Sequence, residues 1–304
     1  MTTGWRYILG LLTLVAATMW LAVLYFPDKR LHLIACDVGQ GDAILVVYGN
    51  TQILVDGGPN NSVLECLERF MPFWDREIEL VVLTHPQTDH FTGLIEVFRR
   101  YKVEKILANS IDSGSSAYQV LKTEIEGNRA SVINPEKGMV ISVGLMQLDI
   151  LHPTEQYILS SVEGPRDNKQ QNVLGAYTTK RDPNVFSIVA ILSLGEFDAL
   201  LTGDIGPEIS DEIAEQLVVR LPLTIEYIKI PHHGSKNGIS NNLLDASHPE
   251  IAVISAGRNN RYGHPHQEVI KLLRDKEIKI MRTDEMGDVE IITDGSEWWL
   301  PEDK

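Results

Sequence analysis

The stretch from Thr84 to His90 reads Thr-His-Pro-Gln-Thr-Asp-His, so two imidazoles, an amide and a carboxylate lie within seven residues. It follows the apolar run 80–83, which predicts a buried strand, and it precedes residues 94–100, whose apolar side chains have helical spacing. Imidazole and carboxylate groups at this density are typical ligands of a first-row divalent metal. Because one short loop cannot complete a metal site, further ligands must come from elsewhere in the chain.

The same pattern recurs at four other places, where an apolar run that predicts a strand ends in a loop that carries His or Asp. These loops contain Asp56, Asp204, the pair His232 and His233, and His264. In layered α/β proteins, the strand ends at one edge of the sheets gather into one site. We therefore expect the five loops to meet around a metal ion.

The remaining pattern predicts an α/β domain. Helical spacing is found in residues 62–70, 116–127 and 207–219, and short apolar runs that predict strands lie between them. Residues 37–42 form a glycine-rich loop with two carboxylates, and the polar stretch 155–183 predicts a long surface loop.

Composition limits the classes of partner. The chain has 304 residues and a formal net charge of −15, which disfavours sequence-blind binding of nucleic acid over the whole surface. Residues 220–282 nevertheless hold ten Lys or Arg against six Asp or Glu, so a local basic face and scattered solvated charges both remain open. Cys36 and Cys66 have no CxxC partner, and we expect two buried thiols.

Residues 8–26 contain no charge. As a helix they would span about 28 Å, roughly one hydrocarbon core, and aromatic residues lie near both ends. We expect an uncleaved single-span membrane anchor within residues 1–30 and one large domain over residues 31–304. A cleaved signal peptide and a core helix are the alternatives.

Five motifs together carry a resemblance to a known family: the glycine-rich loop 37–42, the loop 85–90, Leu-Thr-Gly-Asp at 201–204, His-His-Gly-Ser at 232–235 and Tyr-Gly-His-Pro at 262–265. In their order and spacing, residues 31–300 resemble the metallo-β-lactamase superfamily. More narrowly, they are similar to the extracytoplasmic domain of the ComEC family of competence DNA-uptake proteins. The resemblance implies a four-layer αββα sandwich with metal at one edge of its two sheets.

The resemblance also implies partners and a location. The sequence lacks the multi-span channel region of ComEC proteins, so we expect a free-standing relative with one anchor in the cell membrane and an extracytoplasmic catalytic domain. DNA or another phosphodiester is the expected substrate, and a separate DNA-uptake channel protein is a possible partner.

The metal ligands implied by the resemblance are His85, Gln87, Asp89, His90, Asp204 and His233, with His232 as the less favoured choice for the last. Gln87 stands where the family pattern has a second histidine. The sequence offers no convincing histidine for the remaining position, since His152 falls outside the pattern. Because an amide oxygen is a poor Zn²⁺ ligand and suits Mn²⁺ better, we expect one tight metal, Zn or Mn, and a second that is weak or absent.

The expected chemistry is hydrolysis of a phosphodiester by water that the metal activates. We assign catalytic roles to Asp89, His232 and His264, with proton transfer to the leaving oxygen by one of the two histidines. Substrate contacts are assigned to Gln40, Asp42, Gly234, Ser235 and Gly263. Asp37 and Asp56 are placed behind the ligands, although a structural turn remains open for Asp37 and Asp42.

Two other functions remain open. The overall acidity and the lack of an aromatic-rich basic stripe leave room for hydrolysis of a cell-wall or small-molecule ester. Because Gln87 stands where the family pattern has a histidine, a weakly active module that binds DNA or takes part in assembly also remains open.

Overall fold

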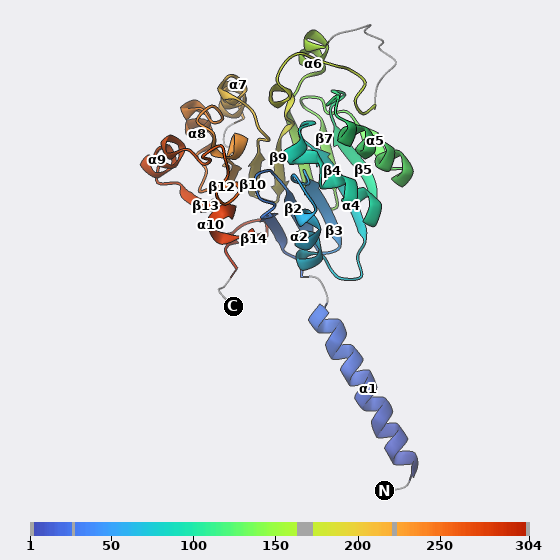
Figure 1. The fold of residues 1–304 in the computed structure, drawn as a ribbon. Coiled ribbons are helices and arrows are strands. Elements are labelled where there is room, and N and C mark those ends of the chain that lie inside the picture. Colours follow the sequence, from blue (N-terminus) through green and yellow to red (C-terminus); the bar gives the residue numbers. More distant parts are fainter. Residues whose placement is uncertain (1–2, 26–27, 163–172, 221–223, 302–304) are drawn as a thin grey trace.

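The computed structural model describes residues 3–25, 28–162, 173–220 and 224–301. Within these ranges two sheets pack face to face, with helices on both outer surfaces (Figure 1). The α/β sandwich expected from the sequence is confirmed.

The first sheet has the order β15-β14-β1-β2-β3-β4-β5-β6 among the described residues. Its strands are β1 (Leu31–Ala35), β2 (Ile44–Tyr48), β3 (Thr51–Val55), β4 (Glu77–Leu83), β5 (Lys102–Ala108), β6 (Ser131–Ile133), β14 (Val289–Thr293) and β15 (Trp298–Trp299). Strands β3 to β6 are parallel to one another, and β2 pairs antiparallel with both β1 and β3.

The second sheet has the order β13-β12-β11-β10-β9-β8-β7 in the same part of the chain. Its strands are β7 (Val140–Val143), β8 (Met146–His152), β9 (Val189–Leu194), β10 (Phe197–Leu201), β11 (Tyr227–Lys229), β12 (Ile251–Ile254) and β13 (Lys279–Arg282). Strands β10 to β13 are parallel.

The helices fall into two outer layers. The first sheet is covered by α2 (Ser62–Phe70), α4 (Leu94–Arg100) and α5 (Ser116–Asn128), and the second by α7 (Pro207–Val218), α8 (Asn241–Ser247) and α9 (Gln267–Asp275). Short helical segments are α3 (Thr88–Phe91), α6 (Glu155–Ser161), α10 (Thr283–Met286) and the 3-10 helices η1 (Pro183–Phe186) and η2 (Pro231–Gly234).

Apolar side chains on both strand faces explain the layers. Leu33 in β1 points into the core between the sheets, whereas its neighbour Ile34 packs under α2, α4 and α5. In the second sheet Val253 belongs to the core between the sheets and Ile254 to the core under α7, α8 and α9. A strand that is buried on both faces must be apolar throughout, and this is why the strands read as continuous apolar runs.

Helix α1 (Thr3–Tyr25) lies apart from the sandwich in Figure 1, and large apolar side chains between Trp5 and Trp20 are exposed. Among the described residues, no helix combines the length and the apolar character needed to cross a membrane. The expected anchor is therefore not shown, and residues 26 and 27 of the predicted apolar segment and its flank lie outside the described part.

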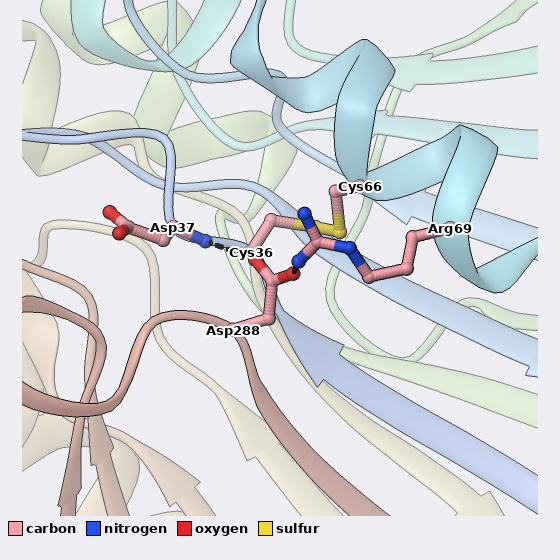
Figure 2. Close-up of a disulfide and its surroundings, with 5 residues drawn as sticks. All are labelled: Cys36, Asp37, Cys66, Arg69 and Asp288. Atoms are coloured by element: carbon pink, nitrogen blue, oxygen red, sulfur yellow. Dashed lines mark hydrogen bonds and ion pairs between the residues drawn. A yellow bond between two sulfur atoms is a disulfide. The ribbon is translucent and has the colours of Figure 1, made fainter.

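Two other expectations need correction. Cys36 and Cys66 are not separate thiols but form a disulfide between the end of β1 and α2, which pack against each other although 30 residues separate the cysteines (Figure 2). The predicted surface loop 155–183 begins with helix α6 and ends in η1, and its residues 163–172 lie outside the described part.

The disulfide lies where the glycine-rich loop 37–42 leaves β1. Figure 2 shows Arg69 of α2 paired with Asp288, whose Oδ1 accepts a hydrogen bond from the Asp37 backbone N–H over 2.8 Å. The start of this loop is thus fixed covalently to α2 and by hydrogen bonding to residues before β14.

Candidate metal centre

Parallel strands deliver the candidate residues to one edge of the sandwich. Asp56 follows β3 directly, and Thr84 and His85 follow β4, its parallel neighbour. In the second sheet, Asp204 lies after β10 and His233 after β11, again on parallel neighbours. Because the carboxyl ends of parallel strands face the same way, the loops meet.

Four side chains form the centre of the site: Asp89, His90, Asp204 and His233. One ligand atom from each lies within 4.8 Å of those of the other three. Asp204 Oδ2 lies 3.3 Å from His90 Nε2 and 3.3 Å from His233 Nε2, and Asp89 Oδ2 lies 3.5 Å from His233 Nε2. The metal quartet, as we call these four residues, comes from three different loops.

Buried imidazole nitrogens test whether the site fits a metal. Nε2 of His85, His90 and His233 is buried and has no hydrogen-bond partner among the described residues. A buried polar atom without a partner is costly, and a metal ion held by the quartet would satisfy Nε2 of His90 and of His233. Two imidazoles and two carboxylates are a donor set for a divalent transition metal, so the quartet fits a divalent ion.

The partners of Nδ1 set the tautomer of each histidine. His90 Nδ1 donates to Asp56 Oδ2 over 2.7 Å, and His233 Nδ1 lies 3.0 Å from the carbonyl oxygen of Ser255. Because each acceptor is an oxygen, Nδ1 carries a hydrogen, and in the neutral ring Nε2 presents its lone pair to the centre. This is the arrangement that orients histidine ligands in metal sites.

Asp56 accepts several hydrogen bonds from the loop that follows β4 and carries His85 and His90. It accepts hydrogen bonds from the Thr84 backbone N–H over 2.8 Å and from Thr84 Oγ1 over 2.7 Å, in addition to that from His90. Asp56 thus lies behind His90, on the side of the ring away from Asp204. Its φ of +60° is uncommon for a non-glycine residue, and the three hydrogen bonds hold it there.

His85 lies beside the quartet, with its ring centroid 4.1 Å from that of His90. The Thr84 hydroxyl gives its single hydrogen to Asp56 and accepts from His85 Nδ1, 3.0 Å away. Nε2 of His85 is therefore unprotonated too. Gln87, in contrast, donates from Nε2 to Asp182 Oδ1 over 3.3 Å, which turns its amide toward the segment before η1.

A buried lysine, Lys229 of β11, lies under the quartet. Its ammonium pairs with Asp42, lies 3.2 Å from Asp204 Oδ1 and donates to the carbonyl oxygen of Gly203 over 2.9 Å. These contacts use its three hydrogens, and they occupy one oxygen of Asp204 while Oδ2 faces the histidines. Lys229 therefore orients Asp204 and offsets negative charge at the site.

Asp42 is a correction to the expected substrate contact. It is 2% exposed, and it is bound from beneath by Lys229, with Oδ1 3.3 Å from His233 Nδ1. The glycine-rich loop thus delivers a carboxylate to the underside of the quartet rather than to substrate. Gly41 makes this possible, because a Cβ there would lie 2.7 Å from Pro59 Cδ and φ is +155°.

Electrostatics within the cluster are strongly coupled. Burial alone would raise the pKa of Asp204, but the imidazoles of His233 and His90 and the ammonium of Lys229 hold this pKa well below its usual range. Burial alone would lower the pKa of His233, yet Asp204 and Asp42 raise it well above its ordinary value. The carboxylates therefore favour positive charge beside them at this site.

Two histidines border the open side of the quartet. The ring of His264 lies 6.4 Å from that of His233, and the ring of His232 lies 5.8 Å from that of His264. Burial, together with the nearby imidazole of His233, lowers the pKa of His264 to about 4. Both rings are partly accessible to solvent.

The other expected substrate residues lie near this border. Gly234 has φ +79°, and a Cβ there would lie 2.6 Å from Pro265 Cβ, so only glycine fits between η2 and the His264 loop. Ser235 Oγ accepts from the Asn237 backbone N–H and is buried. Gly263 is exposed with open space around it, and Gln40 Oε1 accepts from the Gly257 N–H over 3.1 Å.

One acid and one histidine considered in the sequence analysis lie outside the cluster. Asp37 is exposed and accepts a hydrogen bond from the Gly39 N–H within its own turn, so the structure gives it a local role rather than one behind the ligands. His152 is buried and its Nε2 lies 3.0 Å from the carbonyl oxygen of Val185. It does not fill the missing ligand position.

Lys229 and Ser187 were missed from the sequence. Ser187 Oγ accepts from the Asp204 backbone N–H over 3.1 Å and lies 3.3 Å from His85 Nδ1, so it joins the two halves of the site. A serine at a strand start carries no signal. Lys229 did offer one, because a cation inside the apolar run 225–230 needs a buried anion as its partner.

Comparisons with known proteins agree with this geometry. Over 273 residues the chain is 26% identical to ComE operon protein 3 of Bacillus subtilis (strain 168), and over 268 residues it is 26% identical to competence protein ComA of Neisseria gonorrhoeae. The matches cover 84% and 86% of this chain but only 32% of each relative, so the chain spans about a third of their length.

Among solved structures, the metallo-beta-lactamase fold protein YhfI from Bacillus subtilis superposes with a TM-score of 0.54. The match has 11% sequence identity and covers 86% of this chain and 99% of that one, which shows a common fold. The family model described as the metallo-beta-lactamase superfamily matches residues 36–258, the part that contains the quartet, Asp56 and Lys229. The chain therefore belongs to the metallo-β-lactamase superfamily and is related to competence proteins within it.

Proposed function

We propose that this protein is a metal-dependent hydrolase of phosphodiesters. The observation that carries the proposal is the pair of buried Nε2 atoms of His90 and His233, each without a hydrogen-bond partner among the described residues and 3.3 Å from Asp204 Oδ2. Superfamily membership supports a hydrolytic role.

The metal quartet would hold one divalent ion, Zn or Mn. Such an ion lowers the pKa of a bound water and offsets charge on phosphate oxygens. Asp56 and Ser255 keep Nε2 of the two histidine ligands unprotonated, and Lys229 keeps Asp204 Oδ2 directed at the ion. His232 and His264 border the site, where they can hold or transfer a proton at the leaving oxygen.

A second ion would have fewer ligands. His85 would supply one imidazole and Asp204 a shared carboxylate, while Gln87 is engaged by Asp182. We propose that this second position is weak or empty at ordinary metal concentrations, as expected from the sequence.

DNA is the favoured substrate. The support is the similarity to competence proteins, which suggests a context of DNA uptake, and a separate DNA-uptake channel protein is the proposed partner. An ester of the cell wall or of a small molecule is the second candidate, and the net charge of −15 favours it.

We also propose an extracytoplasmic domain that α1 attaches to the membrane. The Cys36–Cys66 disulfide supports the location, because disulfides persist in oxidising compartments. The exposed apolar side chains of α1, among them Leu11, Leu14 and Trp20, support the attachment. Separation of membrane and soluble fractions, with protease protection of the domain, tests both.

The experiment that tests the function compares cleavage of single-stranded DNA, double-stranded DNA and bis-p-nitrophenyl phosphate with Mn²⁺ and Zn²⁺. His233→Ala should abolish turnover and metal retention. His232→Ala and His264→Ala should lower turnover and leave metal content nearly unchanged. The matched control is His248→Asn, an exposed histidine at the end of α8 whose left-handed conformation asparagine tolerates.

The proposal would be refuted if the metal-loaded protein cleaved none of these phosphodiesters. Equal activity of the His233→Ala variant and the control variant would refute it as well.

A further inference from the structure

The loop between β12 and α9 presents an aromatic side chain beside the metal quartet. Asn260 holds this loop in shape: its Oδ1 accepts from the backbone N–H of Tyr262 over 3.1 Å and of His264 over 3.0 Å. Its Nδ2 donates to the carbonyl oxygens of Gly257 over 2.8 Å and of His264 over 2.6 Å. The four bonds fix the backbone on both sides of Tyr262, so its ring is preorganised.

Tyr262 is 51% exposed although its ring belongs to an ordered cluster. It stacks on His264 with 5.7 Å between ring centroids and 24° between planes, and the His264 ring in turn lies 6.4 Å from that of His233. The rings of His233, His264 and Tyr262 thus form a row from the quartet to the solvent-exposed surface. An exposed aromatic at this position contributes little to the core, and it offers a flat apolar surface to whatever occupies the metal site.

One cationic group contacts this ring, and a second adjoins the same loop. The Arg261 guanidinium lies 5.1 Å from the Tyr262 ring centroid, and Arg261 is exposed. Exposed Lys236 adjoins the same border, because its backbone N–H donates to His266 Nδ1 and the His266 ring lies 4.9 Å from that of His264. Part of the basic excess of residues 220–282 is therefore gathered beside the candidate metal centre.

We propose that Tyr262 and Arg261 form a stacking subsite for an unpaired nucleobase of a single-stranded nucleic acid, whose neighbouring phosphodiester lies at the metal quartet. The proposal deepens the function proposed above and rests on it for the position of the phosphate. An aromatic ring and a guanidinium stack on bases of any sequence, whereas the bases of a duplex are already stacked on one another. An ester polymer without bases would gain nothing from the ring.

The test measures binding without catalysis. The full-length protein in EDTA is titrated, with fluorescence anisotropy as the readout, into a labelled single-stranded oligothymidylate and into an oligonucleotide of the same length with abasic residues. Tyr262→Ala should weaken binding of the first by roughly fivefold to a hundredfold, the range for loss of one stacked base, and leave the second unchanged. Tyr262→Phe keeps the ring and should bind like the parent protein.

A matched control is Phe73→Ala, since Phe73 is an exposed aromatic just before β4, at the opposite end of that strand from Thr84. Equal weakening of both oligonucleotides by Tyr262→Ala, or no weakening, would overturn the subsite. So would tighter binding of duplex DNA or of a cell-wall polymer than of the oligothymidylate. Base-dependent binding without any cleavage would refute the proposed function alone, whereas cleavage that ignores Tyr262→Ala would refute the subsite alone.

Discussion

Replacing Lys229 with methionine tests whether the underside of the metal quartet is a charge-balanced cluster. The side chain is 1% exposed, and its ammonium contacts Asp42, Asp204 and Gly203. Methionine fills a similar volume but leaves the carboxylate of Asp42 buried without its cation. Breaking a buried pair in this way costs about 3–5 kcal/mol. We therefore expect the free energy of unfolding of metal-free Lys229→Met to fall by about that amount.

A double-mutant cycle with Asp42→Asn separates the pair from simple loss of packing. Asparagine keeps the shape of Asp42 and removes its charge, so the double variant should be more stable than the sum of the single changes predicts. We expect a coupling free energy of about 2 kcal/mol or more, because contacting residues in one ionic network couple on this scale. Urea unfolding in EDTA, followed by circular dichroism, measures all four proteins.

The matched control for this cycle is the exposed pair Lys102 and Glu77, in which the Lys102 side chain is 68% exposed. Lys102→Met should leave the free energy of unfolding nearly unchanged, because water screens an exposed pair. If Lys229→Met costs no more than this control, or if the cycle is additive within about 0.5 kcal/mol, the charge-balance argument is refuted.

Three further changes probe other parts of the site. Asp56→Asn should lower metal affinity roughly 10–100-fold, as measured by competition with a chelator, because His90 loses the acceptor that orients it; an unchanged affinity would contradict this role. Cys36→Ser with Cys66→Ser should lower the free energy of unfolding by about 3–4 kcal/mol, from the entropy of closing a 30-residue loop, and equal stability under reducing and oxidising conditions would contradict it. Although burial lowers the pKa of His90 and His233, Asp204 raises it well above 6.5 in metal-free protein. The stability that their protonation contributes is complete below pH 6.5 and is lost as pH rises through the folded-state pKa. Because the ion displaces these protons, metal affinity should rise with pH from about 6 to 8, and calorimetry that detects no proton release would contradict this.

Strand-end chemistry made much of the site predictable. Asp56, the loop 85–90, Asp204 and His233 each follow an apolar run, and parallel strands bring their ends to one edge. That logic depends only on local pattern and on a general property of sheets.

The charged residues beneath the candidate ligands could not be predicted from the same pattern. Lys229 and Asp42 are 187 residues apart in sequence, and although a lysine inside an apolar run calls for a buried anion, nothing in the sequence says that Asp42 is that anion. The Cys36–Cys66 disulfide was misjudged for a related reason, since no spacing rule reports that the end of β1 packs against α2. Gln87 stands at a family ligand position. The direction of its side chain is set by its hydrogen bond to Asp182, which the sequence does not reveal.

The central claim is that a divalent ion binds between the two sheets at the metal quartet. The most direct measurement is a crystal structure of the protein with Mn²⁺ or Zn²⁺, with anomalous scattering recorded at the metal edge. We predict one strong peak about 2.0–2.2 Å from Nε2 of His90 and of His233 and from a carboxylate oxygen of Asp89 and of Asp204. A saturated crystal whose strongest peak lies away from these four residues, or two equally strong peaks, would contradict the account.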